Sequence, residues 1–175
     1  MTGPDPTPGT GVTVTVDDRT DDGLDDPDHW AAVASATLVA EGVTGGHLDL
    51  LFVDRDAMAE LNATHMGADG PTDVLAFPLD GPDIVTPPGS GPAGSDRGPV
   101  TISVHLGDVV VCPEVARSQA PEHAGTETAE LTLLIVHGVL HILGHDHAEA
   151  DERAEMQRRE RHHLARYGIG HPVPS

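Results

Sequence analysis

A long apolar segment near the C-terminal end sets the strongest limit on how this chain can fold. Nine of the thirteen residues from 131 to 143 are apolar, and the exceptions are Thr132, His137, Gly138 and His141. A helix on the surface of a protein shows one apolar stripe, whereas a helix that is apolar all round must be covered on every side. The chain must therefore bury this helix in its core, together with two histidines.

The spacing of the histidines indicates a metal site. His137 and His141 are one helical turn apart, so both imidazoles leave the same face. Two adjacent buried imidazoles need partners, and one shared metal ion satisfies both. Gly144 can end the helix and turn the chain, so that His147 returns to the same ion. Since three histidines with one open position are typical of catalytic zinc, we predict one Zn²⁺ per chain with these three ligands as catalytic residues.

The same spacing is similar to that of the metzincin peptidases, whose helix reads H-E-x-x-H-x-x-G-x-x-H. In this chain Gly138 stands at the position of the glutamate that acts as general base. A small residue there leaves room for a bulkier substrate group beside the metal. The motif therefore disfavours peptide hydrolysis by the usual mechanism, and a zinc peptidase is kept as an alternative only.

Shorter apolar runs elsewhere in the chain predict a small sheet. The expected strands span residues 12–16, 47–53, 72–77 and 104–111. The expected helices span residues 27–41, 54–64, 113–119, 126–143 and 148–167, with Asp26 as the cap of the first. Strands separated by helices indicate a mixed α/β or α+β layer instead of an all-β sandwich.

The two ends of the chain and one internal segment fall outside this pattern. Residues 1–10 and 171–175 are expected to be tails; the first ten are rich in Pro, Gly and Thr and cannot bury enough apolar surface to order themselves. Residues 80–103 are rich in Gly and Pro and are expected to form a long mobile loop. A single metal-dependent hydrolase domain is therefore expected over residues 11–170.

The net charge is unusual. The chain has 29 acidic and 9 basic residues, all nine of them arginine, and a formal charge of −20. Taken alone, this argues against the usual basic type of nucleic-acid-binding domain. It suits a cytoplasm of high salt, where repulsion between carboxylates is screened, and codon bias in a GC-rich genome is the alternative. The single cysteine, Cys112, and the absence of a signal sequence or apolar span predict a cytoplasmic protein without membrane partners.

The sequence contains three blocks, GPTDVLAFP, LGDVVVCPE and HGVLHILGHDH. All three resemble signatures of one family, the YbeY family of bacterial rRNA maturation factors. Residues 137–147 (HGVLHILGHDH) resemble its signature H-G-x-L-H-L-x-G-Y-D-H. Residues 70–78 (GPTDVLAFP) resemble P-T-[ND]-V-L-S-F-P, and residues 106–114 (LGDVVVCPE) resemble L-G-D-[IL]-V-[IL]-C. The blocks occur in the family's order, and the resemblance covers about residues 48–152.

This resemblance implies a zinc-dependent, single-strand-specific endoribonuclease, a hydrolase that acts in 16S rRNA 3′-end maturation and 70S ribosome quality control. It assigns the zinc to His137, His141 and His147. It further implies an α+β fold, a small mixed β-sheet of about four strands with helices packed on it, and a zinc site in a cleft at the helix that carries the histidines. It also implies that the partners are rRNA and the small ribosomal subunit, with ribosomal proteins or an assembly GTPase, and that DNA is not a partner. A non-catalytic ribosome-assembly factor with a structural zinc is the other alternative.

Several acidic residues near these blocks are candidates for a role at the site. Asp146 lies between two histidines, where a carboxylate can orient an imidazole, and Asp108 lies in the third block. Both are candidate catalytic residues, and a turn residue or a strand-end carboxylate is the simpler interpretation. Thr72 and Asp73 open a predicted strand and are candidates for substrate binding, with turn chemistry as the alternative.

The arginines are the remaining candidates, because phosphate contacts dominate nucleic-acid affinity. Five of the nine lie on the last predicted helix, and we expect Arg158, Arg159 and Arg161 to bind substrate. The alternative is a solvated helix whose acids come first and bases last, as its dipole favours. The family has a functional arginine in a Y-R-G segment, but Met66 stands at that position here, so this role cannot be carried over.

Overall fold

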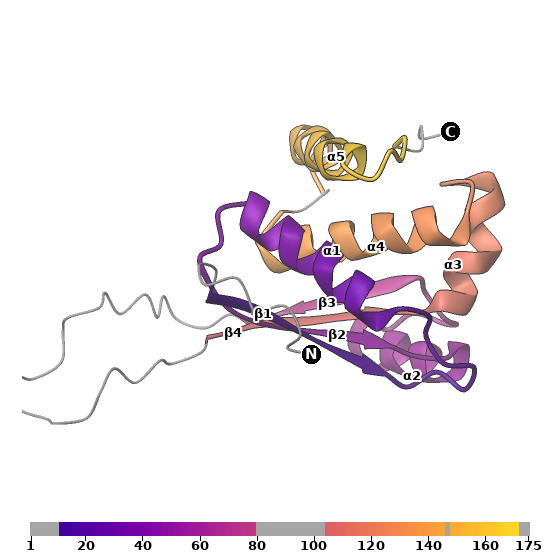
Figure 1. The fold of residues 1–175 in the computed structure, drawn as a ribbon. Helices are drawn as coiled ribbons and strands as arrows, with labels where there is room; N and C mark the ends of the chain where they lie inside the picture. Colours follow the sequence, from indigo (N-terminus) through magenta and orange to yellow (C-terminus); the bar gives the residue numbers. More distant parts are fainter. Residues whose placement is uncertain (1–10, 80–103, 146–147, 172–175) are drawn as a thin grey trace, which may run out of the picture.

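The structure is a computed structural model that describes residues 11–79, 104–145 and 148–171 (Figure 1). Its elements along the chain are β1 (Gly11–Asp18), α1 (Pro27–Ala40), β2 (Gly45–Phe52), α2 (Arg55–Met66), β3 (Val74–Pro78), β4 (His105–Val111), α3 (Pro113–Gln119), the 3-10 helix η1 (Ala120–Glu122), α4 (Glu127–Ile142) and α5 (Ala150–Ala165). Every predicted strand and helix is present, with ends shifted by a few residues, and η1 was not predicted. Residues 1–10, 80–103 and 172–175, which include most of the predicted tails and the predicted loop, lie outside the described residues.

The four strands form one mixed sheet in the order β1-β2-β4-β3. β2 runs parallel to both β1 and β4, whereas β3 pairs antiparallel with β4. Along β2 the side chains alternate, so that Leu48, Leu50 and Phe52 are fully buried on one face and the residues between them are half-buried on the other. The predicted α+β fold with a mixed four-stranded sheet is confirmed.

The helices cover the two faces of the sheet unequally (Figure 1). α1 and α4 lie on one face and enclose the larger core with the inward residues of the strands. α2 lies on the opposite face, where Met58 forms a smaller core with Val53, Leu75 and Val110. α5 lies across the outer side of α4. α4 is thus enclosed by the sheet, α1 and α5, which explains why its sequence is apolar all round.

Local sequence signals fix the two ends of α4. The side chain of Thr126 accepts a hydrogen bond of 3.1 Å from the backbone N–H of Ala129, which caps the first turn. At the other end Gly144 adopts a φ of 93°, which favours glycine, and turns the chain away. Although α4 is apolar, neither it nor any other helix of the described ranges is long and apolar enough to cross a membrane.

Gly138 allows α4 to approach the sheet closely. A Cβ atom at this position would lie 2.6 Å from Cγ1 of Val109 and 3.3 Å from Cγ2 of Val74. A separation below 3.0 Å is essentially never seen for real Cβ atoms, so a side chain here would force α4 or the strands to shift. The missing side chain therefore serves the packing of α4 on the sheet, and the expectation that it also makes room for substrate stays a prediction.

We expect Gly138→Val to lower the free energy of unfolding by about 1–3 kcal/mol, because the added carbon atoms overlap Val109. The gain in helix propensity over glycine, roughly 0.5 kcal/mol, is too small to offset this overlap. Urea denaturation followed by circular dichroism measures the difference. Ala63→Val, at an exposed position of α2, is the matched control and should change the value by less than about 0.5 kcal/mol. Equal effects of the two substitutions would contradict this account.

Candidate functional site

His137 and His141 converge on one point beside α4. Their Nε2 atoms are 3.0 Å apart, and their rings are inclined at 76° to each other, so the rings meet at an edge instead of stacking. Two nitrogens of a tetrahedral zinc site lie about 3.3 Å apart, which is close to the observed distance. Both side chains are half-buried, so the point of convergence opens to the surface. The structure thus brings two of the three predicted ligands together, while His147 lies outside the described residues.

A buried carboxylate from α5 sets the orientation of His137. Nδ1 of His137 donates a hydrogen bond to Oε1 of Glu160, whose side chain is only 6% exposed. The other oxygen of Glu160 accepts a hydrogen bond of 2.6 Å from Nε2 of His171. With Nδ1 held in this way, His137 directs Nε2 toward His141, which is the usual arrangement of a metal-binding histidine supported by a carboxylate.

Glu160 is ionised at neutral pH. Burial raises the pKa of this carboxyl, but the hydrogen bonds from His137 and His171 outweigh burial, and the pKa lies below its ordinary value of 4.5. Glu160 was not predicted as a site residue, because the charged sequence of α5 indicates a solvated helix. One signal was available: Glu160 lies four residues after Met156 and four before Leu164, on the face that α5 buries.

Two hollows open on either side of His137. The first, between α4 and α5, is lined by Arg153 and Glu160 among other residues. The second, between α4 and β3, has Met66 at its rim. Asp73 and His137 line both hollows and therefore mark the place where the two meet. A cleft is thus present at the helix that carries the histidines, as predicted.

Thr72 and Asp73 lie directly before β3. Oδ1 of Asp73 accepts a hydrogen bond of 2.8 Å from the backbone N–H of Val74 and one of 3.3 Å from the hydroxyl of Thr72. The backbone oxygen of Asp73 accepts another, of 2.9 Å, from the N–H of Cys112. These bonds are turn chemistry that begins β3, and they also hold the carboxylate of Asp73 at the edge of both hollows. Substrate binding by this pair stays a prediction.

Met66, the residue at the position of the expected arginine, lines the second hollow. It is the last residue of α2 and is 64% exposed, and it provides an uncharged thioether there. Arg153, from the first turn of α5, lines the first hollow together with His137. Sequence analysis selected other arginines of the same helix and missed Arg153, because only the packing of α5 on α4 brings its side chain to this hollow.

Asp108 lies on the face of the sheet opposite the histidine pair. In β4 the side chain of Val109 points toward Gly138 of α4, so the preceding residue points away from α4. Oδ1 of Asp108 lies 3.2 Å from Nε2 of His105 on that far face. This geometry does not support a catalytic role for Asp108 beside the histidine pair. The other candidate base, Asp146, lies outside the described residues.

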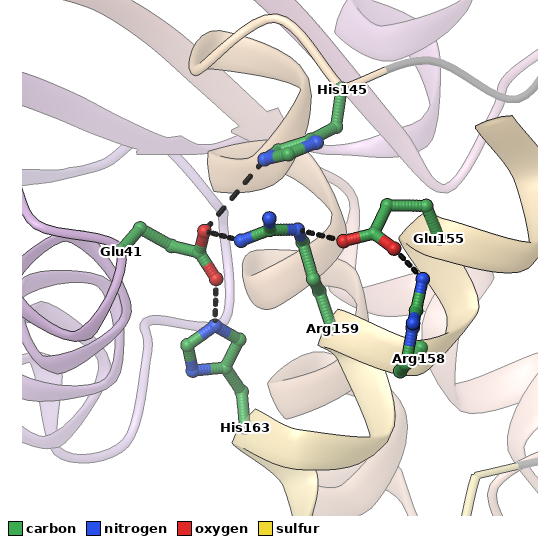
Figure 2. A network of polar contacts seen from close by, with 6 residues as sticks. All are labelled: Glu41, His145, Glu155, Arg158, Arg159 and His163. Atoms are coloured by element: carbon green, nitrogen blue, oxygen red, sulfur yellow. Dashed lines mark hydrogen bonds and ion pairs between the residues drawn. The ribbon is translucent and has the colours of Figure 1, made fainter.

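The arginines of α5 differ in their surroundings, as Figure 2 shows. Arg159 donates hydrogen bonds of 2.5 Å to Glu41, which follows α1, and of 2.7 Å to Glu155. Arg158 pairs with the other oxygen of Glu155, and its side chain is 72% exposed. Arg161 is also exposed. Arg159 therefore links α5 to α1, whereas Arg158 and Arg161 face solvent on the outer surface of α5.

Glu41 is the centre of this network and joins the ends of three helices. Its side chain is 7% exposed, and Oε1 accepts a hydrogen bond of 2.6 Å from Nε2 of the buried His163. Nε2 of His145, just after α4, lies 3.7 Å from Oε2 (Figure 2). Burial raises the pKa of Glu41, but the bonds from His163 and Arg159 outweigh it and hold the pKa below 4.5. The network fixes α5 in the position from which Glu160 reaches His137.

We expect Glu41→Gln to lower the free energy of unfolding by about 2 kcal/mol at neutral pH, because Arg159 and His163 lose their charged acceptor. Since the pKa of Glu41 is depressed in the folded chain, this contribution is present above about pH 4.5 and is lost as the pH falls through the folded pKa. Urea denaturation at neutral pH and at about pH 3.5 should therefore show a smaller difference in the free energy of unfolding between the variant and the wild type at the lower pH. Glu60→Gln, exposed on α2, is the control, and a difference that does not change with pH would refute the assignment.

The chain is similar over most of its length to proteins of one family. The family model described as Endoribonuclease YbeY matches residues 25–168. Endoribonuclease YbeY of Salinispora tropica is 48% identical over 132 residues, which cover 75% of this chain and 81% of that protein. Endoribonuclease YbeY of Frankia alni is 42% identical over 137 residues, or 77% of this chain and 72% of that protein. For the protein of the same name from Mycolicibacterium vanbaalenii the identity is 48% over 109 residues, which span only 55% of that relative.

A solved structure has a similar fold. The solution structure of TM1509 from Thermotoga maritima superposes with a TM-score of 0.52 and covers 90% of this chain and 91% of that chain. Its sequence is 22% identical, so this likeness concerns the fold alone. The match to the family model includes both histidines of α4 and the supporting Glu160. From this match and from its relatives, the chain belongs to the YbeY endoribonuclease family.

Proposed function

We propose that this chain is a zinc-dependent, single-strand-specific endoribonuclease that acts in 16S rRNA 3′-end maturation and ribosome quality control. The observation that carries the proposal is the convergence of His137 and His141, with Nε2 atoms 3.0 Å apart, where two hollows meet. The names of the relatives support RNA as the substrate.

The residues of the site fit zinc held by His137, His141 and His147, with one position open. When bound there, zinc supplies a water of lowered pKa and a charge that polarises a phosphoryl oxygen. Glu160 keeps a proton on Nδ1 of His137 and fixes the ring, so that Nε2 remains a ligand atom. The shape and rigidity of the site thus depend on how α5 packs on α4.

Two carboxylates have separate proposed roles. Asp146 directly precedes His147 and is our candidate base, which would accept a proton from the attacking water. Asp73, held by the N–H of Val74 at the edge of both hollows, would position the substrate. A carboxylate there can accept a hydrogen bond from a ribose 2′-hydroxyl, which DNA lacks, and so favours RNA.

The path of the substrate follows from the two hollows. A single strand that crosses their junction would place one phosphate beside the histidines, with Arg153 on the α5 side. Arg158 and Arg161 extend a cationic edge along the exposed face of α5. With a net charge of −20, RNA affinity in dilute buffer should be weak, so the small ribosomal subunit and ribosomal proteins or an assembly GTPase would hold the chain on its rRNA.

A non-catalytic assembly factor with structural zinc is the second candidate, and Met66 is the observation that favours it. A thioether at the rim of the second hollow provides no charge for a phosphate. A peptidase of the metzincin type is disfavoured, because a side chain at Gly138 would overlap Val109 and the general base of those enzymes therefore has no room.

Zinc content and cleavage of single-stranded RNA test the proposal directly. We expect about one zinc ion per wild-type chain and loss of both zinc and cleavage in His137→Ala. Glu160→Gln should weaken zinc binding by roughly 10–100-fold, because the neutral amide supports the imidazole less well. Glu60→Gln is the matched control on α2. Zinc content and cleavage should be measured at both low and molar KCl, because salt screens the repulsion between the surface carboxylates and RNA.

Each alternative gives a different result. Cleavage that survives in His137→Ala would come from a contaminating nuclease and would remove the support for the proposal. Normal zinc content without RNA cleavage, together with precursor 16S rRNA accumulating in a His137→Ala strain, would favour the assembly factor. Cleavage of casein would favour the peptidase.

The exposed arginines of α5 give a separate prediction. We expect Arg158→Gln with Arg161→Gln to weaken binding to the small ribosomal subunit several-fold and to reduce the salt dependence of binding, with zinc content unchanged. Arg159→Gln should instead lower the free energy of unfolding, because Arg159 holds Glu41. Arg19→Gln, at the end of β1, is the control. Unaltered binding of the double variant would refute a role of this edge in binding.

A further inference from the structure

A second group of metal-binding side chains lies on the sheet face opposite α1 and α4. Asp49 of β2 and His105 and Asp108 of β4 each present one ligand atom, and these three atoms lie within 4.8 Å of one another. Because the sheet stands between this group and α4, the group belongs to neither hollow beside His137.

A β-bulge brings His105 and Asp108 to the same face. Residues three apart in a regular strand point to opposite faces. Here the pairing of β4 with β2 skips Leu106, an extra residue, so the alternation is reset. Gly107 adopts a φ of 148°, and a Cβ there would lie 2.5 Å from the carbonyl oxygen of Phe77. A glycine is therefore required at this position, and the sequence builds the bulge that aims both side chains together.

His105 faces two carboxylates at short distance without hydrogen-bonding to either. Its Nε2 atom lies 3.0 Å from Oδ2 of Asp49 and 3.2 Å from Oδ1 of Asp108. The nitrogen is shielded from solvent, yet neither contact has hydrogen-bond geometry. Two ligand atoms at right angles around an ion, each about 2.1 Å from it, lie about 3.0 Å apart. Both contacts of His105 thus have the separation of neighbouring metal ligands.

The carboxylate of Asp49 is supported by His47 of the same strand, which in turn contacts β1. Its Oδ1 lies 2.9 Å from Nε2 of His47, and Nδ1 of His47 lies 2.9 Å from the hydroxyl of Thr13 on β1. One oxygen of Asp49 is therefore held in place while the other faces His105, and metal ligands are commonly supported in this way. Asp17 lines the same hollow as Asp49 and Asp108, where it pairs with Arg19 at 2.7 Å.

We propose that Asp49, His105 and Asp108 form a second divalent-metal site, separate from the histidines of α4. One imidazole and two carboxylates suit a borderline transition ion such as Zn²⁺ or Mn²⁺. The ion would tie β2 to β4 at the bulge, where Leu106 interrupts the regular pairing, and would stabilise the fold. This site does not depend on the proposed nuclease activity.

Metal binding by the full chain with the α4 site removed tests this. Chelator-stripped protein carrying His137→Ala and His141→Ala should bind about one Zn²⁺ in calorimetry and equilibrium dialysis, and saturating Zn²⁺ should raise Tm by roughly 5 °C. Adding His105→Asn or Asp108→Asn should weaken binding at least roughly tenfold. Asp17→Asn removes a charge from the same hollow but none of the three ligands, and should weaken binding less than about threefold.

A second measurement avoids substitutions among the proposed ligands. Mn²⁺ added to the chain with His137→Ala and His141→Ala should broaden the amide NMR signals of Asp49 and Asp108 before those of α5. The proposal would be overturned if the chain with His137→Ala and His141→Ala bound no ion. Binding that persists undiminished when Asp49→Asn and Asp108→Asn are combined, or broadening centred elsewhere, would overturn it as well.

Discussion

The burial of α4 is the constraint on which the rest of this structure depends. An apolar helix must be covered on all sides, and here the sheet, α1 and α5 each cover one side. The contact with the sheet is close because Gly138 has no side chain to separate α4 from Val109. His137 and His141 lie on the part of α4 that stays half-exposed, where the two hollows meet. The histidine pair is thus carried by a helix most of whose residues are buried.

Buried carboxylates orient this arrangement. Glu160 fixes His137, Glu41 holds Arg159 and His163, and the fully buried Glu130 accepts a hydrogen bond of 2.9 Å from Nδ1 of His123. A buried carboxylate without partners would be costly, so each of these bonds also fixes how one segment packs on another. The chain has no lysine, and in each case histidine or arginine supplies the partner. Most of the other acidic residues in the described ranges are exposed to solvent.

The acidity of the chain therefore has two consequences. Over the surface as a whole it opposes binding to RNA, so the proposed function relies on a few arginines such as Arg153, Arg158 and Arg161 and on the proposed ribosomal partners. Locally it favours cations. The group formed by Asp49, His105 and Asp108 lies on the face of the sheet that carries α2, opposite α1 and α4, so one small domain offers groups suited to cations on both faces.

Much of the fold was predictable from the sequence, since the order and type of the strands and helices follow from short-range apolar patterns, caps and turns such as Thr126 and Gly144. The histidine pair was predictable for the same reason, because a spacing of four residues on a helix fixes which side chains share a face.

Glu160, Glu41 and Arg153 were not predictable in this way, because their roles arise from the packing of α5 on α4 and α1, between residues far apart in the chain. The same holds for Asp108, because strand alternation alone does not say which face of the sheet packs against α4. The bulge at Leu106 then places Asp108 beside His105. The sequence by itself thus determined the elements and the spacing of the histidine motif, through local geometry. Only the tertiary structure decided which charged groups support the motif and which lie across the sheet from it, because those contacts depend on long-range packing.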